Sequence, residues 1–173
     1  MISWPSFHPV VEDDLIHISS DSLDPAALLS RAHHPKAGAV VLFSGEVRNN
    51  NAGKAVAYLE YEAHVSMASK MISSILLEAK AKWSLNIALA QHRIGKVEVG
   101  DTAVVVITSS AHRKEAYAAN RFIIDKIKHE VPIWKCEYFV DGTKEWGGRC
   151  GCESVVGSRE SEVGSSESGG ERR

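Results

Sequence analysis

The chain has 173 residues, of which 44% are hydrophobic and 24% are charged, with a formal net charge of −2. This length suits one domain with a hydrophobic core, and the small net charge gives no overall attraction to nucleic acid. The apolar run at 39–43 is far too short to span a bilayer, and residues 1–15 lack the features of a signal peptide. The composition therefore predicts a globular, cytosolic protein.

The first part of the chain contains a predicted leader, a strand and a helix. Residues 1–13 resemble a flexible leader, and the alternation of apolar and polar residues over 15–19 predicts a short strand. Either Asp24 or Ser22 is suited to cap the helix that follows, because Pro25 stands near its first position.

Two strands and a helix are predicted next. Residues 37–48 and 56–64 are rich in β-branched and aromatic residues, and the Asn- and Gly-rich loop 48–54 separates them. We expect these two strands to pair as a hairpin. Helical spacing over 66–83 places one apolar stripe on a single face, formed by Ala68, Ile72, Ile75, Leu76 and Ala79.

In the second half of the chain, two predicted strands are again followed by a long helix. Residues 87–95 and 102–110 are predicted strands with a turn at 99–101, and 111–130 is a second long helix. The expected buried stripe of this helix consists of Ala116, Ala119, Ile123 and Ile127.

The helix should end near Val131, because Pro132 disfavours a helical conformation in the residue before it. A strand is predicted over 133–140, followed by a turn over 141–148. We interpret 14–152 as one domain of the α+β class, with a mainly antiparallel sheet that carries two long helices on one face. The Ser-, Glu- and Gly-rich tail 153–173 is expected to be disordered, because it has too little apolar surface to bury.

Two lysines flank Pro132, where one element ends and another begins. Lys128 falls in the last helical turn and Lys135 on the following strand, so a helix that packs on its own next strand would bring them together. Two partly desolvated ammonium groups repel, which favours loss of a proton from one of them and creates an acid, base or nucleophile. The alternative is a helix-terminal lysine favoured by the macrodipole and a solvated strand lysine.

A second candidate site lies where strand 102–110 meets helix 111–130. The free N–H groups of a first helical turn attract anions, and nearby Arg and His side chains would complete a phosphate or carboxylate pocket. A serine N-cap followed by surface cations is the alternative. The residues concerned are Ser109, Ser110, His112 and Arg113.

Other polar segments carry weaker signals. Arg48 stands at the rim of loop 48–54, which has no P-loop pattern and resembles an ordinary loop. His92 precedes Gly95 at a strand end and is most simply a packed histidine with a hydrogen-bonded partner. No metalloprotease, serine-hydrolase or dinucleotide-binding motif occurs. The candidate chemistry is therefore cationic, which suits a phosphorylated substrate or a developing oxyanion.

The three cysteines favour a reducing compartment over a disulfide framework, because their number is odd. Cys150 and Cys152 offer two thiolates, whereas a structural zinc site needs about four ligands, so we expect no bound metal. Cys136 follows Lys135 directly. Strand alternation predicts that these two side chains point to opposite faces, which argues against a persulfide beside the lysine.

Taken together, residues 37–149 resemble the catalytic (large) subunit of molybdopterin synthase. The resemblance rests on the order and spacing of GAVVLFSGEVRN, LEYEAHVSMA, HRIGKVEVGD, TSSAHRKEAY and FIIDKIKHEVPIWKCE, with LEYEA and SMA closer to the eukaryotic branch. Cys136 is a departure, because a second basic residue is common there among relatives. The segment with Cys150 and Cys152 and the tail also lie outside the shared pattern.

This resemblance implies a fold of the α/β-hammerhead type that forms a homodimer. It also implies a small ubiquitin-like subunit docked on each protomer, so that the assembly is a heterotetramer. The C-terminal Gly-Gly thiocarboxylate of that subunit would enter the active site. Two sulfur atoms would pass in turn to cyclic pyranopterin monophosphate, which makes the dithiolene of molybdopterin in molybdenum cofactor biosynthesis. No metal or organic cofactor is implied for this subunit.

The resemblance also implies site residues. Lys128 and Lys135 match the two active-site lysines of the family, and Arg48, His112 and Arg113 match its substrate-pocket cations. We expect Lys135 to act as acid, base or nucleophile at the transferring centre. Lys128 would hold the thiocarboxylate terminus and stabilise negative charge. The other three would bind the pterin phosphate, some of them in the site of the neighbouring protomer.

Three rival hypotheses use the same residues differently. A lysine Schiff-base enzyme would act on a phosphorylated carbonyl compound with the same lysine pair. A non-catalytic docking module would bind a ubiquitin-like protein and tolerate loss of both lysines. A structural anion-binding domain would show no turnover at all.

Overall fold

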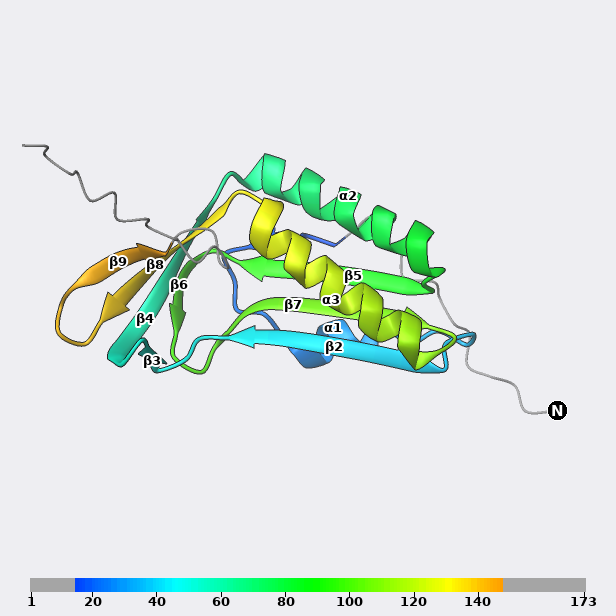
Figure 1. The fold of residues 1–173 in the computed structure, drawn as a ribbon, viewed down its shortest axis with the longest axis horizontal. Helices are drawn as coiled ribbons and strands as arrows, with labels where there is room; N and C mark the ends of the chain where they lie inside the picture. Colours follow the sequence, from blue (N-terminus) through cyan, green and yellow to red (C-terminus); the bar gives the residue numbers. More distant parts are fainter. Residues whose placement is uncertain (1–14, 148–173) are drawn as a thin grey trace, which may run out of the picture.

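The computed structural model describes residues 15–147, which fold into two sheets and three helices (Figure 1). The predicted leader 1–13 and tail 153–173 lie outside these residues, as do Cys150 and Cys152. In the first sheet β1 runs parallel to β5 and the other neighbours are antiparallel. Its strand order is β1 (Ile18–Ser19), β5 (Ile87–Arg93), β7 (Thr102–Ser110) and β2 (Ala39–Glu46).

The second sheet lies at one end of the first and is antiparallel throughout (Figure 1). A fifth strand, β6 (Gly95–Glu98), pairs with its long strand β4 (Lys54–Ala63). The remaining order runs from β3 (Asn50–Asn51) through β4 to β8 (Ile133–Phe139) and β9 (Lys144–Gly147). The expected mainly antiparallel α+β fold is therefore confirmed, with the strands divided between two sheets.

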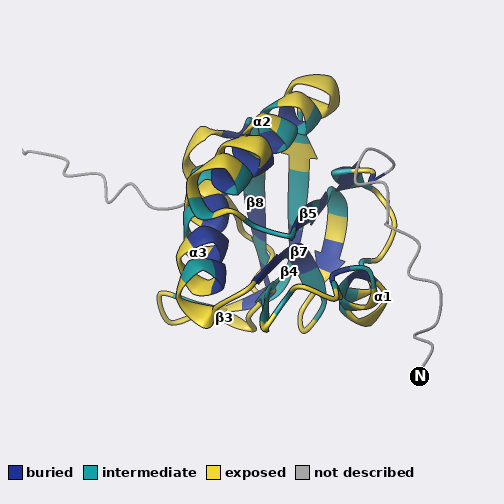
Figure 2. Ribbon diagram, turned by 90° about the vertical axis from the view of Figure 1, so that its right-hand side faces the viewer, coloured by how far each residue is buried: buried dark blue, intermediate teal, exposed yellow. Residues whose placement is uncertain are grey.

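Helices cover both faces of the first sheet. The long helices α2 (Val65–Trp83) and α3 (Arg113–Glu130) pack on one face and turn their buried sides toward β5 and β7 (Figure 2). The short helix α1 (Pro25–Ser30) packs on the other face. The Asp24 side chain caps it by accepting hydrogen bonds from two backbone N–H groups. Both predicted apolar stripes are confirmed as buried, and α3 also buries Asn120 and Ile124.

Strand β7 is buried on both of its faces, which explains its unbroken apolar sequence. Val104 and Val106 contribute to the core beneath the long helices, whereas Val105 and Ile107 contribute to the core beside α1. A strand with two apolar faces needs a layer on each side and a neighbour on each edge. The neighbours that β7 takes are β2 and β5.

The predicted hairpin between 37–48 and 56–64 is wrong. β2 pairs with β7, and β4 pairs with β6 and β8 in the other sheet. The intervening loop instead forms its own tight hairpin, because Ala52 and Gly53 both have positive φ, 49° and 84°, and turn β3 directly onto β4. A two-residue turn of this kind pairs the start of β4 with Asn50–Asn51, so β4 does not pair with β2.

Two further strands differ from the prediction. The strand expected over 87–95 ends at Arg93, and Gly95, with φ of +78°, starts β6 in the second sheet. The turn expected over 141–148 is shorter, because 144–147 pairs with β8 as β9. β9 lacks the alternating apolar pattern by which sequence analysis finds strands, whereas β6 is short but does alternate, with Val97 buried between Lys96 and Glu98.

The end of α3 is fixed by Pro132, as predicted. Val131 has extended φ and ψ of −74° and 134°, and β8 begins at Ile133. The Pro132 carbonyl oxygen accepts a hydrogen bond from the backbone N–H of His64, at 3.2 Å. The junction between α3 and β8 is thereby held against the start of α2.

Asn120 provides a test of how α3 is anchored. Its buried amide nitrogen donates to the carbonyl oxygens of Val41, at 3.2 Å, and Val106, at 3.0 Å. Replacing Asn120 with Ala should lower the free energy of unfolding by about 1–3 kcal/mol, because it removes both donors from a buried site. Urea unfolding would measure this, with Arg121→Ala, an exposed ion-pair change, as the control expected within about 0.5 kcal/mol. Equal effects of the two changes would contradict the anchoring role.

Candidate active site

A cavity of about 250 Å³ opens where the two sheets meet. Its walls come from the ends of β2, β5 and β7, from the last turns of α3, and from the inner faces of β4 and β8. Apolar side chains of these elements form the floor. Among the lining residues the charged ones are Glu46, Arg48, Lys128, Lys135 and Glu137.

Both predicted lysines line this cavity. Lys128 lies in the last turn of α3 and Lys135 lies on β8, and Pro132 between them sends the chain from helix to strand. The expected packing of the helix on its own next strand is wrong, because α3 packs on α2, β2 and β7, but the two lysines still meet in one cavity. Arg48, which follows β2, lines the cavity as well, so three cations face one space.

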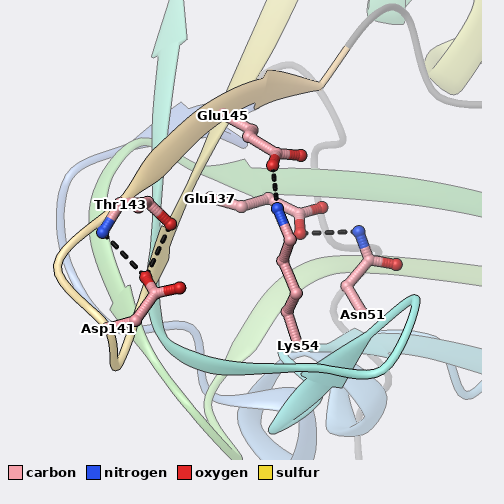
Figure 3. A network of polar contacts seen from close by, with 6 residues as sticks. All are labelled: Asn51, Lys54, Glu137, Asp141, Thr143 and Glu145. Carbon is pink, nitrogen blue, oxygen red and sulfur yellow. Dashed lines mark hydrogen bonds and ion pairs between the residues drawn. The ribbon is translucent and has the colours of Figure 1, made fainter.

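Lys135 is paired with a buried carboxylate that sequence analysis did not single out. Its Nζ atom lies 2.6 Å from Oε1 of Glu137, a residue that is only 5% exposed. The second oxygen, Oε2, accepts a hydrogen bond of 2.7 Å from the side-chain amide of Asn51 (Figure 3). Both carboxylate oxygens thus have donors, which is what a buried charge requires. A signal existed in the sequence, because residues two apart on a strand share a face.

The neighbouring strand restricts where the Lys135 side chain can lie. Gly147 on β9 is the register partner of Lys135. A Cβ atom at position 147 would lie 2.9 Å from Cε and 3.7 Å from Nζ of the lysine. The absence of a side chain at Gly147 therefore leaves the space that the lysine stem occupies.

A second polar cluster supports the loop that carries Asn51. Figure 3 shows the Lys54 ammonium group on the Glu145 carboxylate, which links β4 to β9. In the turn before β9, the backbone N–H and the hydroxyl of Thr143 both donate to Asp141, at 2.8 and 2.6 Å. These exposed contacts tie the β3–β4 hairpin and the β8–β9 turn together around the buried carboxylate of Glu137.

Lys128 has a different environment. Within residues 15–147 no carboxylate lies within ion-pair distance of its ammonium group, and Nζ lies 5.9 Å from the centre of the Phe43 ring. The two lysines are therefore unlike: the charge of Lys135 is compensated by the protein, whereas that of Lys128 is available to a ligand.

His92 also lines the cavity, beneath the last turn of α3. It is 7% exposed, and its Nδ1 lies 2.7 Å from the Arg93 carbonyl oxygen, so the prediction of a packed, hydrogen-bonded histidine is confirmed. The pKa of His92 is lowered to about 4: burial is the main cause, the hydrogen bond to Arg93 partly opposes it, and the Lys128 charge adds to the lowering. The imidazole is therefore neutral at pH 7.

His112 and Arg113 lie at the opposite end of α3 and do not line this cavity. Fifteen residues separate Arg113 from Lys128, which corresponds to about 22 Å along a helix. One chain therefore brings Arg48 to the lysines but not these two cations, whose part in substrate binding stays a prediction. His112 occupies the N-cap position of α3 without a side-chain capping bond.

Cys136 lies outside the cavity, as strand alternation predicts. It is fully buried, and its register partners are Glu60 and Trp146 on the adjacent strands. Over residues 15–147 no group of three or more His, Cys, Asp or Glu side chains is arranged to hold a metal ion. None of the described helices is long and apolar enough to cross a membrane.

Comparison with known proteins gives one consistent family. A family model described as MoaE protein matches residues 18–130. The molybdopterin synthase catalytic subunit of Thermoplasma volcanium is 42% identical over 131 residues, which cover 76% of this chain and 96% of that protein. The same subunit of Staphylococcus carnosus is 47% identical over 115 residues, or 66% of this chain and 76% of that protein.

Solved structures agree with these relatives. Molybdopterin synthase from Staphylococcus aureus superposes with a TM-score of 0.73 at 39% identity, covering 77% of this chain and 96% of that one. A complex of subunits 1 and 2 of molybdopterin-converting factor from Helicobacter pylori gives 0.63 at 22% identity, covering 75% and 88%. At 22% identity the likeness to this complex concerns the fold alone.

The Glu137 carboxylate should be important for stability. In Glu137→Gln, a neutral amide replaces the carboxylate. Its oxygen can accept from either the Lys135 ammonium group or the Asn51 amide, but its NH2 group then faces the other donor. We expect the free energy of unfolding to fall by about 1–3 kcal/mol. Urea unfolding would measure this beside Glu145→Gln, which alters an exposed ion pair and should change stability by less than about 1 kcal/mol. A Glu137→Gln protein as stable as this control would show that the buried pair adds nothing.

Proposed function

The chain belongs to the MoaE protein family, and from that membership we propose that it is the catalytic subunit of a molybdopterin synthase, a sulfurtransferase of molybdenum cofactor biosynthesis. The family expected from the sequence is thereby confirmed. The relatives carry this enzyme name at 42% and 47% identity, and the solved Staphylococcus aureus structure shares the fold.

The proposed substrate is cyclic pyranopterin monophosphate, and the proposed sulfur donor is the C-terminal Gly-Gly thiocarboxylate of a small ubiquitin-like subunit. In each of two transfers, the thiocarboxylate sulfur bonds to a side-chain carbon of the pterin while the carbon–oxygen bond at that carbon breaks and its oxygen substituent leaves. Water then attacks the acyl carbon of the resulting thioester, so that the bond from this carbon to sulfur breaks and the terminus leaves as a carboxylate. We assign no metal or organic cofactor to this subunit and place the reaction in the cytosol.

The observation that carries this proposal is the unlike environment of the two lysines in one cavity. Lys128, which has no carboxylate partner among residues 15–147, is suited to hold the anionic thiocarboxylate terminus and to stabilise negative charge that develops on it. Lys135, held by Glu137, is suited to exchange a proton at the transferring centre, because a carboxylate lies 2.6 Å from its ammonium group.

Arg48 extends the cationic wall from the side of β2. We assign it to the phosphate group of the pterin, since a guanidinium group binds phosphate oxygens in a bidentate manner. His112 and Arg113 are assigned to the same phosphate, but in the cavity of a second copy of the chain, because about 22 Å of helix separates Arg113 from Lys128 within one copy. A homodimer in which each α3 serves the partner's cavity meets this requirement.

Reconstitution would test the roles of the lysines. The protein is mixed with a thiocarboxylated small subunit and cyclic pyranopterin monophosphate, and molybdopterin is assayed as its fluorescent oxidation product. Lys135→Ala and Lys128→Ala should each lower the rate by roughly 100-fold or more, since each removes a group that acts at the reacting centre.

Lys126→Ala is the matched control for both changes. Lys126 lies on α3 near Lys128, but it pairs with Glu78 of α2 and does not line the cavity. Normal turnover in both lysine variants would refute the assigned roles. A wild-type protein that binds the small subunit tightly and yields no product would favour the docking-module hypothesis.

Mixed dimers would test whether Arg113 acts across the dimer. Arg113→Ala should raise the KM for the pterin strongly, because it removes a phosphate-binding cation. If cavities are shared, a dimer of one Arg113→Ala copy and one Lys128→Ala copy has one intact cavity. Random mixing of the two variants should then restore about a quarter of wild-type activity. If every cavity is built from one chain, mixing restores nothing.

A further inference from the structure

We propose that Asn51 is a positioning residue of this site, which holds the Glu137 carboxylate in the orientation that fixes the Lys135 ammonium group. The inference deepens the proposed function and rests on it for the reaction that Lys135 performs. Asn51 itself is assigned to no reacting atom, because its effect passes through Glu137.

The carboxylate of Glu137 has one donor on each oxygen. Nζ of Lys135 lies 2.6 Å from Oε1, and the side-chain amide of Asn51 donates to Oε2 at 2.7 Å. Together the two contacts fix the rotation of the carboxylate group. Because Glu137 is only 5% exposed, loss of the Asn51 contact would leave Oε2 without a donor in a buried site. The carboxylate would then turn toward another donor and away from Lys135.

The donor on Oε2 is neutral, which distinguishes Glu137 from the carboxylate opposite it. Glu137 on β8 and Glu145 on β9 are register partners, as are Asn51 and Lys54 on the β3–β4 hairpin. In Figure 3 the hairpin gives its amide to Glu137 and its ammonium group to Glu145. A cation in place of the amide would compete with Lys135 for the charge of Glu137 and repel its ammonium group. The amide supplies a hydrogen bond without this competition.

The backbone of the hairpin sets the position of Asn51. Ala52 and Gly53 turn β3 onto β4, and the Asn50 side chain closes this turn by accepting a hydrogen bond of 3.3 Å from the backbone N–H of Gly53. β4 in turn pairs with β8, so the amide and the carboxylate belong to one sheet. The contact therefore joins two elements whose relative position the strand pairing already fixes.

The expected consequence concerns the rate of the reaction and not binding. In the proposed function Lys135 exchanges a proton at the transferring centre, whereas Lys128 and Arg48 bind anionic groups. A misdirected Lys135 ammonium group lowers the fraction of bound complexes in which the reacting atoms are correctly placed. Asn51 should therefore influence the maximum rate and leave the affinity for both ligands largely unchanged.

Amine labelling tests the positioning without any turnover. The protein is treated with a low dose of acetic anhydride, and acetylation of each lysine is followed by peptide mass spectrometry in wild type, Asn51→Leu and Asn51→Gln. Asn51→Leu removes the donor at similar volume, so the ion pair should open more often. Acetylation of Lys135 should then be roughly 10-fold faster, since a hydrogen bond to a charged group is lost. Asn51→Gln keeps an amide donor and should stay within about 3-fold of wild type.

Lys126 is the internal control in every sample. Its side chain is 27% exposed, as is that of Lys135, and it pairs with the carboxylates of Glu78 and Glu130. General unfolding would expose both lysines, whereas loss of positioning should change Lys135 alone. An unchanged ratio of the two labelling rates in Asn51→Leu, or an equal rise of that ratio in Asn51→Gln, would overturn the proposal.

Steady-state kinetics tests the consequence for the reaction. In the reconstituted synthase, Asn51→Leu should lower kcat by roughly 10-fold and leave both the KM for the pterin and the affinity for the small subunit within about 2-fold. Asn51→Gln should recover most of the rate. Asn51→Ser, whose hydroxyl is too short to reach the carboxylate, should behave like Asn51→Leu in both experiments and remains testable if that variant fails to fold.

Two outcomes separate this inference from the proposed function. A raised KM with unchanged kcat in Asn51→Leu would refute positioning of Lys135, while turnover by the wild type would still support the proposed function. A wild-type protein that yields no product would refute the proposed function, while the labelling ratio of Lys135 to Lys126 would still test the contact.

Discussion

The steric restriction that Pro132 imposes on Val131 determines the site. It ends α3 after Glu130 and sends the chain into the second sheet as β8. The Pro132 carbonyl oxygen also accepts a hydrogen bond from the backbone N–H of His64, so the connection from β4 to α2 is joined to the connection from α3 to β8. The cavity lies at this junction, which is why its walls come from both sheets and from the last turns of α3.

The three cationic side chains of the cavity differ in how their charge is compensated. Lys135 has a buried counterion, whose own second oxygen is satisfied by Asn51. The Lys128 ammonium group lies 5.9 Å from the centre of the Phe43 ring, and the residue lines the same cavity as His92. Arg48 is exposed at the rim, where water solvates it. The roles proposed for these residues, proton exchange, anion capture and phosphate binding, follow this gradation from compensated to solvated charge around a cavity of about 250 Å³.

Much of the fold could be predicted from sequence, because long helices and fully buried strands have strong periodic signals. The stripes of α2 and α3 and the strand β7 were found in this way. Pairing was harder to predict: the turn at Ala52 and Gly53 joins two short strands, and the division into two sheets depends on contacts distant in sequence. The lysines were found through Pro132. Glu137 was missed although its spacing from Lys135 placed both on one face of a strand, and Asn51 was missed because its contact with Glu137 joins residues distant in sequence.

Gly147 has a consequence for the entropy of the reaction. A free lysine side chain has rotamer freedom worth up to about 2 kcal/mol, which is lost when its ammonium group is fixed in a transition state. At Lys135 part of that loss occurs on folding, because the stem lies against Gly147 of β9 and Glu137 pairs with its ammonium group. The entropic cost of ordering the Lys135 side chain thus lowers the stability of the second sheet, and it is not incurred again when the substrate binds. If β9 were more flexible, the Lys135 side chain would lose this entropy in every turnover, when the transition state forms.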